Sequence, residues 1–193
     1  MKYAADHKPA VTERLKQQAA RQLRERGVAG VSVKSVMAAE DMTVGGFYTH
    51  FESKEAMLAE AIRTAFRQSG EGFYKLIEKR GDVEWLKTVV DLYLSSYHRD
   101  HRDSACPVAT LMSDIGLQDV SIRQVFEEEM MALAARYSER LAALNKSQAQ
   151  DLSLALIALL AGAVQLARAV ASEELSASIL KNSAEAAWKL LEN

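Results

Sequence analysis

A stretch between residues 32 and 55 gathers side chains that suit the binding of phosphate groups. The hydroxyl groups of Thr43 and Tyr48 can hydrogen-bond phosphate oxygens. Lys54 directly follows Ser53, a residue that favours helix starts, and the free N–H groups of a helix N-terminus already attract anions. Two further candidates for phosphate contacts are Ser32 and Lys34. For each polar residue the alternative is local capping or simple exposure.

The same stretch reads as three short helices separated by two tight breaks. Ser32, Thr43 and Ser53 each stand where a helix N-cap is expected. Phe47 and Phe51 lie four residues apart, on one face of the middle helix, and are expected to be core. Two short helices joined by a turn of about four residues form the helix-turn-helix pattern, whose second helix enters the DNA major groove.

The run from Met42 to Phe51, followed by Glu52 to Glu55, resembles the signature of TetR-family transcriptional regulators. The match is dense over residues 32–55 and looser over the first 55 or so. The resemblance implies a dimer that binds double-stranded DNA, and DNA contacts from Thr43, Tyr48, His50 and Lys54. We accordingly expect a helix-turn-helix domain over residues 1–52 and a ligand-binding and dimerisation domain over residues 53–193.

Two positions depart from the family pattern. The turn reads Glu40-Asp41 where Ala-Gly is usual, and Val44 stands where Lys or another polar residue is frequent. Val44 cannot hydrogen-bond a base edge, although it can touch a thymine methyl group. Gly45 and Gly46 allow the backbone to approach the groove closely. We therefore expect Val44 and Gly45 to lie at the DNA, with modest direct reading of bases.

Composition favours an all-α protein of about nine helices. The 193 residues include only two prolines and nine glycines, and helix-forming residues dominate. The net charge of −2 argues against a general nucleic-acid binder, but residues 1–55 carry nine Lys and Arg against seven Asp and Glu. A single cysteine and the lack of an apolar leader indicate a reducing compartment, the cytoplasm. The longest apolar run has 11 residues, too short to span a bilayer.

The remaining helices are predicted from apolar residues at helical spacing and from the breaks between these stripes. Residues 1–9 are expected to form a loose arm. Longer helices are predicted over residues 10–26, 53–80, 82–101, 107–117, 120–145, 147–171 and 173–191. The helix over 53–80 bridges both domains, and Gly70 and Gly72 within it are candidates for a ligand-sensitive bend or for an early helix end.

The last two helices carry enough apolar surface for a two-fold interface, a four-helix bundle built from two chains. The predicted interface residues are Ala155, Ala158, Gly162, Leu175, Ile179, Ala186 and Leu190. The alternative is burial within one chain.

Cys106 is a second candidate site. It stands immediately before Pro107, a favoured first helical residue, and helix N-termini lower thiol pKa values. A thiolate that senses oxidants or electrophiles is therefore one interpretation, and an inert buried cysteine is the other. His98 and His101 lie nearby, but this spacing predicts a polar loop, and neither a metal nor a cofactor is expected.

Aromatic, methionine and polar side chains on the middle and late helices are candidates for an effector pocket, although each is also typical of core. They are Phe66, Phe73, Trp85, Tyr93, Tyr97, Met112, Phe126, Met130, Gln165 and Arg168. Gln165 could equally hydrogen-bond across the dimer.

Together these features predict a dimeric regulator, a repressor, that binds a pseudo-palindromic operator. Release follows from a small apolar ligand or from modification of Cys106. One alternative is a ligand-binding helical module without DNA binding. A small helical enzyme is the other, but the sequence holds no nucleophile–base set, phosphate loop or firm metal motif.

Overall fold

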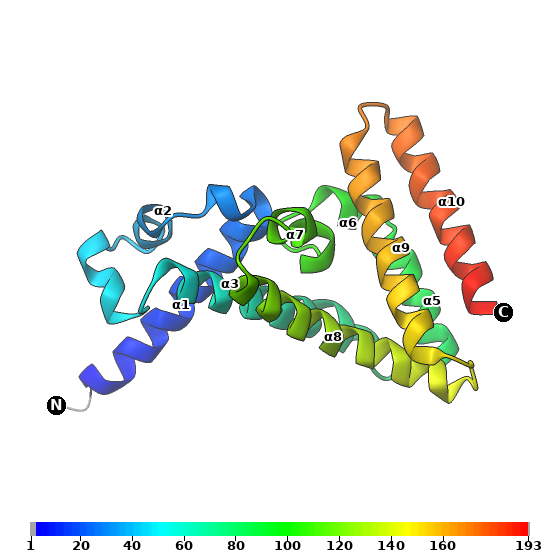
Figure 1. Ribbon diagram of the computed structural model, residues 1–193, viewed down its shortest axis with the longest axis horizontal. Coiled ribbons are helices and arrows are strands. Elements are labelled where there is room, and N and C mark those ends of the chain that lie inside the picture. The colour runs from blue at the N-terminus through cyan, green and yellow to red at the C-terminus, as the bar shows by residue number, and fades with distance from the viewer. Residues whose placement is uncertain (1–2, 193) are drawn as a thin grey trace.

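The computed structural model describes residues 3–192, and side chains from residue 8 onward. Ten α-helices, two short 3₁₀ helices and one π-helix make up the described chain, which contains no strand. The expected all-α class is confirmed. The N-terminal helices form one end of the molecule and the last two helices form the other (Figure 1).

The N-terminal end is built on α1 (Tyr3–Arg26). The apolar stripe of Leu15, Ala19 and Leu23 on this helix is completely buried, mainly against α3 (Lys54–Ser69). The expected loose arm is wrong within the described residues, because α1 already begins at Tyr3 and includes Pro9; Met1 and Lys2 lie outside them. A 3₁₀ turn, η1 (Val28–Gly30), leads to α2 (Val33–Ala38) and then to η2 (Val44–Thr49).

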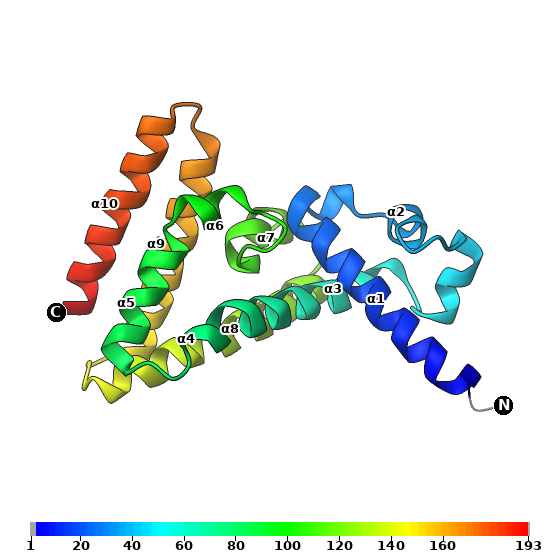
Figure 2. The same cartoon turned by 180° about the vertical axis from the view of Figure 1, so that it is seen from behind.

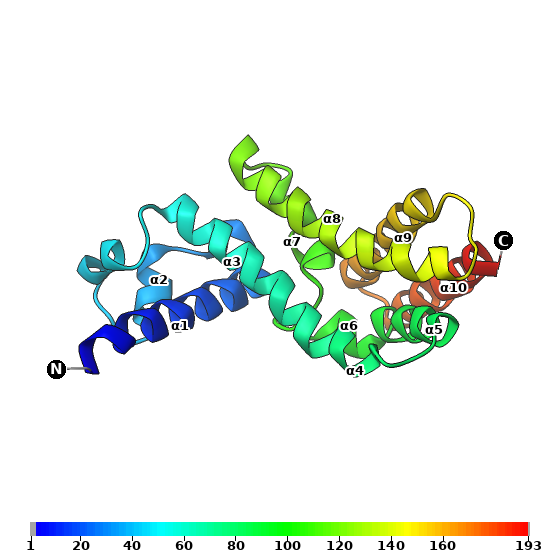
Figure 3. The ribbon, with the colours of Figure 1, turned by 90° about the horizontal axis from the view of Figure 1, so that it is seen from below.

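The bridging helix is not regular. α3 ends at Ser69, a π-helical segment η3 (Gly70–Tyr74) follows, and α4 (Lys75–Ile77) completes the rod. A π turn adds one residue to the helical repeat. This shift places Tyr74 in the core, where an unbroken α-helix would place Phe73, and Phe73 is only half-buried. The expected irregularity at Gly70 and Gly72 is thus a π segment within a continuous rod, seen from below in Figure 3.

The central helices close around this rod. The predicted helix over 82–101 is two helices, α5 (Asp82–Tyr93) and α6 (Ser96–Asp100), because the chain turns at Leu94 and Ser95 caps α6. The Ser95 hydroxyl accepts the His98 N–H at 3.2 Å. α7 (Pro107–Ile115) follows a polar loop and contacts both α1 and η1, so it touches the N-terminal end directly.

Three long helices complete the chain: α8 (Val120–Ala143), α9 (Ala149–Ala169) and α10 (Glu173–Glu192). α9 is long and apolar enough to cross a membrane by length and composition alone. It contacts α5, α6, α7, α8 and α10, as a core helix does. α10 is the outermost element and packs on α9 and α5 (Figure 2).

Candidate nucleic-acid interface and effector cavity

The helix-turn-helix starts with a reciprocal cap at Ser32. The Ser32 hydroxyl accepts the Ser35 N–H at 3.0 Å, and the Ser35 hydroxyl accepts the Ser32 N–H at 3.0 Å. The turn after α2 contains Asp41 in a left-handed conformation, with φ of 54°. The Met42 N–H closes this turn on the Met37 carbonyl at 2.9 Å. Glu40 and Asp41 therefore form the tight turn, although the family pattern usually has Ala-Gly at these two positions.

The recognition segment is a 3₁₀ helix of six residues, Val44–Thr49. The predicted side-chain cap by Thr43 is wrong, because its hydroxyl makes no capping hydrogen bond and remains exposed. The segment is fixed instead from its buried side. Phe47 and Phe51 are buried as expected, with ring centroids 5.4 Å apart. Since apolar packing holds the segment, its outward polar groups stay available.

Seven of the eight predicted DNA contacts are solvent-exposed on α2, η2 and the first turn of α3. They are Ser32, Lys34, Thr43, Val44, Gly45, Tyr48 and Lys54. Tyr48 is the most prominent, with 76% of its surface exposed. Lys54 is the first residue of α3, whose cap is the Ser53 hydroxyl accepting the Ala56 N–H at 3.0 Å. Exposed hydroxyl and ammonium groups beside two helix starts make a surface suited to phosphates.

His50 differs from the other seven because it is half-buried against α1. Its Nδ1 lies 2.7 Å from the Thr12 hydroxyl, which in turn donates to the Lys8 carbonyl at 2.9 Å. Burial and the nearby Lys8 charge lower the pKa of His50. The imidazole thus ties η2 to α1, with a neutral ring favoured. Its predicted DNA contact stays a prediction.

Two contacts anchor this N-terminal end to the rest of the molecule. Arg24 of α1 is buried and donates to the carbonyls of Ala65 and Asp103 and to Gln68. The second contact is formed by Asp114 of α7, whose carboxylate accepts the Val28 N–H at 2.8 Å. The recognition segment is therefore positioned by α3 and also by α7.

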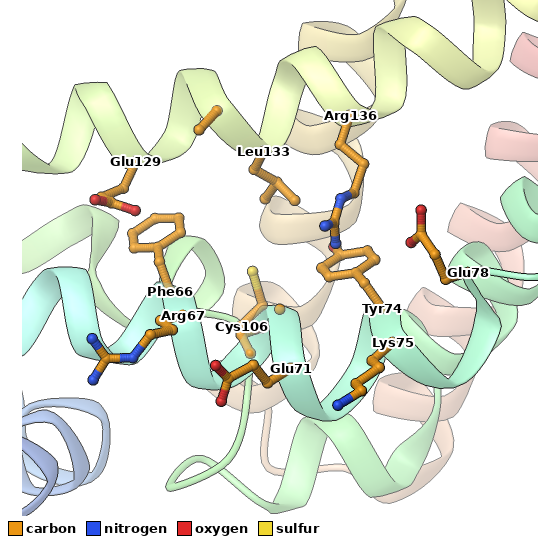
Figure 4. Close-up of a pocket in the computed structure, with 13 residues that line it drawn as sticks. Phe66, Arg67, Glu71, Tyr74, Lys75, Glu78, Cys106, Glu129, Leu133 and Arg136 are labelled. Atoms are coloured by element: carbon orange, nitrogen blue, oxygen red, sulfur yellow. The ribbon is translucent and has the colours of Figure 1, made fainter.

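A cavity of about 460 Å³ lies between the bridging rod and α8 (Figure 4). Phe66 and Leu133 supply apolar wall, and Cys106 lies between them at the start of α7. Charged groups from both helices surround this wall: Arg67, Glu71, Lys75, Glu78, Glu129 and Arg136. Burial raises the pKa of Glu129. The lining thus combines an apolar wall with six charged side chains, and a cavity of this volume is within the range of small-molecule sites.

An aromatic cluster closes one end of this cavity. The Tyr74 and Tyr137 hydroxyls are 2.8 Å apart and buried, and burial raises the pKa of both. Tyr74 also stacks on Trp85, with ring centroids 5.7 Å apart. The Arg136 guanidinium covers the Tyr74 ring at 5.2 Å from its centroid. Because the cluster is hydrogen-bonded and packed, it forms a rigid end wall.

Cys106 lies at the start of α7 and is buried, which agrees with the second of the two interpretations of the sequence. The thiol is buried, and burial raises its pKa, although a hydrogen bond with Tyr93 partly opposes this effect. The expected lowering of the thiol pKa by the helix N-terminus is therefore wrong. The Cys106 N–H donates to His98 Nε2 at 2.9 Å, while His98 Nδ1 donates to the Tyr93 carbonyl at 2.7 Å. Both His98 nitrogens are used within the fold, and burial lowers its pKa to about 4.

The predicted pocket residues separate into several environments. Phe66 lines the cavity of Figure 4, whereas Phe73 and Tyr97 line a second cavity across the rod. Trp85 and Tyr93 are buried core, and the half-buried Met112, Phe126 and Met130 pack against that core. Sequence reasoning missed Tyr74, Leu133 and the charged lining residues, since only the π turn and the pairing of α3 with α8 bring them together.

Gln165 and Arg168 of α9 line neither of the two larger cavities. Arg168 donates to the carbonyls of Arg99 at 2.7 Å, His98 at 2.8 Å and Ala109 at 3.2 Å. Burial lowers its pKa to about 10. Arg168 therefore joins α9 to α6 and α7. Gln165 is half-buried and lies on the same outer side of α9 as Gly162 and Leu166.

The predicted dimer residues lie on surface that the single chain leaves open. Four are exposed, namely Ala155, Ala158, Leu175 and Ala186, and three are half-buried, namely Gly162, Ile179 and Leu190. The two exposed members of this set on α9, Ala155 and Ala158, are small, so a second helix could approach closely there. No group of three or more residues suited to holding a metal gathers among residues 3–192.

This geometry is that of a helix-turn-helix protein whose remaining helices form a larger C-terminal part. A family model described as "Bacterial regulatory proteins, tetR family" matches residues 17–61. A second model, "Transcriptional regulator LmrA/YxaF-like, C-terminal domain", matches residues 83–179. The chain belongs to the TetR family, and is thus a DNA-binding transcriptional regulator. A search of the curated proteins found no match.

Solved structures support the same fold along nearly the whole chain. A TetR-family regulator from Cytophaga hutchinsonii has a TM-score of 0.80 at 16% identity, covering 96% of this chain and 95% of that one. The reduced form of NemR from E. coli has a TM-score of 0.78 at 16% identity, covering 92% and 95%. A TetR regulator from Chloroflexus aurantiacus has a TM-score of 0.75 at 24% identity, covering 97% and 95%. At these identities the likeness concerns the fold.

Proposed function

We propose that the protein is a dimeric, cytoplasmic repressor that leaves its operator when a small, largely apolar ligand enters the cavity between α3 and α8. The observation that carries this proposal is the continuous rod from Lys54 to Ile77. Its first residue lies at the DNA-binding surface, and its other end lines the cavity. A ligand that prefers a different position of the rod shifts the balance between two states of the dimer.

In this mechanism, dimerisation determines the distance between the two recognition segments. Two recognition segments must reach successive major grooves of a pseudo-palindrome, which lie about 34–36 Å apart or a larger whole number of turns. A ligand that stabilises another spacing releases the DNA. To convert a population from 1:99 to 99:1, the ligand must bind one state better by roughly 5.5 kcal/mol.

The proposal is tested first by binding to the DNA upstream of the protein's own gene, measured by a mobility shift at low and high salt. Binding is expected at low salt and should weaken as salt rises, because phosphate contacts release counterions. The absence of a shift at low salt would instead favour a ligand-binding module without DNA binding. Addition of apolar compounds to the bound complex then screens for the effector.

Lys54→Ala is expected to weaken binding to all DNA sequences alike. The ammonium group lies at the start of α3 and contacts a phosphate in our proposal, and phosphate contacts carry no sequence information. Fluorescence anisotropy with operator and unrelated DNA across a salt series measures the effect, and the salt slope should fall by about one. Lys181→Ala, an exposed position on α10, is the control and should change nothing. A loss confined to the operator would contradict the phosphate role.

Modification of Cys106 is a second route to release, because the thiol lines the same cavity. Burial raises the thiol pKa, so N-ethylmaleimide should react slowly with the folded protein at pH 7 and faster as the pH rises. Cys106→Ser should abolish any release from DNA that the reagent causes while leaving DNA binding intact. Equal release from the variant and the parent protein would remove Cys106 from the mechanism.

A further inference from the structure

A second cavity, of about 520 Å³, lies on another face of the same bridging rod. Rod residues Gln68, Gly72 and Leu76 line it, whereas Gly70, Tyr74 and Glu78 line the first cavity. These two sets alternate at helical spacing, so they point to different sides. The remaining walls come from α1, α5, α6 and the loop before α7. Ser69 borders both cavities, and the second cavity lies on another side of the rod, at the junction with the N-terminal end.

One part of this cavity is apolar and open to solvent. This apolar part is formed by the side chains of Phe73, Leu76, Leu92 and Tyr97. Leu76 has 82% of its surface exposed. Large apolar side chains that gather uncovered at one place mark a binding surface more often than scattered ones do. The volume lies within the roughly 300–1,000 Å³ typical of small-molecule sites.

A buried cation that makes no direct salt bridge lies at another part of the lining. Arg24 has only 5% of its surface exposed, and its hydrogen-bond acceptors are the Ala65 and Asp103 carbonyls and the Gln68 amide oxygen, at 2.9 Å. It makes no salt bridge with any carboxylate among the described side chains. The nearby Glu25 pairs with Arg21 instead, at 2.9 Å. The carboxylates of Asp103 and Glu25 interact electrostatically with the Arg24 guanidinium, but neither pairs with it directly. Buried charges are usually paired, so this guanidinium can accept an anion in direct contact.

The lining of the second cavity contains no carboxylate. It includes no Asp or Glu, whereas the first cavity is lined by three glutamates. His98 is held neutral by its two hydrogen bonds, and His101 stacks on Tyr97, with ring centroids 3.9 Å apart. Arg24 is the only Arg or Lys among the lining residues of this cavity. A guanidinium matches a carboxylate in shape as well as in charge.

We infer that the second cavity binds an amphipathic carboxylate. Its carboxylate lies against Arg24 and Gln68, and its hydrocarbon part covers Phe73, Leu76 and Leu92. This site is separate from the proposed effector cavity, and its occupation can be measured without DNA.

The test is calorimetric titration of the purified protein with decanoate, decan-1-ol and decyltrimethylammonium. Decanoate should bind about tenfold or more tighter than the alcohol, because hydrogen bonds to charged groups contribute about 1.5–3 kcal/mol. Decyltrimethylammonium, which is positively charged, should bind more weakly than either of the other two compounds. Equal affinity for decanoate and decan-1-ol, or no binding of decanoate, would overturn the inference.

Three variants locate the site. Leu76→Asp places a negative charge at the apolar opening on an exposed position, so it should fold normally and weaken decanoate about tenfold or more. Arg24→Gln should remove the preference for decanoate over decan-1-ol. Arg136→Ala, in the first cavity, is the matched control and should leave decanoate binding unchanged. Loss of decanoate binding in Arg136→Ala with retention in Leu76→Asp would assign it to the first cavity and contradict the proposal.

Discussion

Gly27→Ala is expected to lower the free energy of unfolding by about 2–6 kcal/mol. Gly27 has φ of 70° and ψ of −178°, a conformation that is essentially restricted to glycine and costs other residues about 1–3 kcal/mol. An added Cβ would also meet the Asp114 carboxylate at 1.9 Å. This carboxylate would have to withdraw from the Val28 N–H, at a further cost of roughly 1–3 kcal/mol. Guanidinium unfolding followed by circular dichroism at one protein concentration measures the loss.

The glycine at position 70 offers a matched control. Gly70 has right-handed helical angles and open space around an added Cβ, so Gly70→Ala should leave stability unchanged or raise it by up to about 1 kcal/mol. In a double-variant cycle, Asp114→Ala should relieve the clash but retain the backbone strain of Gly27→Ala. Wild-type stability in Gly27→Ala would contradict the assigned role of the Asp114 contact.

Ala158→Arg is expected to abolish tight operator binding by separating the dimer. Ala158 is exposed in the single chain and lies at the centre of the predicted α9–α10 interface. Two-fold symmetry would bury two unpaired guanidinium groups there, and uncompensated charges cost several kcal/mol. The dimer dissociation constant should therefore rise by roughly 100-fold or more. Analytical ultracentrifugation measures the assembly, and anisotropy with full operator measures the DNA affinity.

Ala135→Arg provides the same chemical change at an exposed position of α8, outside the predicted interface. It should leave both assembly and DNA binding intact. If Ala158→Arg remained a dimer with full operator affinity, the α9–α10 interface would be wrong, whereas monomers with unchanged operator affinity would contradict only the need for a dimer.

The helix-turn-helix could be predicted in detail because its determinants are local. Ser32 and Ser53 cap their helices as the sequence indicates, and Phe47 and Phe51 form the expected core. The failure at Thr43 has a local cause as well: the segment after it is 3₁₀ rather than α, so the capping geometry does not arise.

The cavities could not be predicted to the same extent, because they depend on register and on contacts between distant helices. An uninterrupted helical repeat selects Phe73 as the buried aromatic, and the π turn substitutes Tyr74. Arg136 and Glu129 belong to a stretch of α8 whose role becomes visible only when α3 packs against it. The neutral hydrogen-bond acceptors of Arg24, the Asp103 carbonyl and the Gln68 amide oxygen, likewise belong to segments that are many residues away in the sequence.

The short helix α7 connects the cavity between α3 and α8 with the DNA-binding end. Its first turn adjoins Cys106, which lines the cavity, and its last turn carries Asp114, which holds the Val28 N–H. Nine helical residues form a rigid arm of about 13 Å. The contacts of α7 therefore join the cavity to the segment that follows α1, along a route that does not pass through the bridging rod.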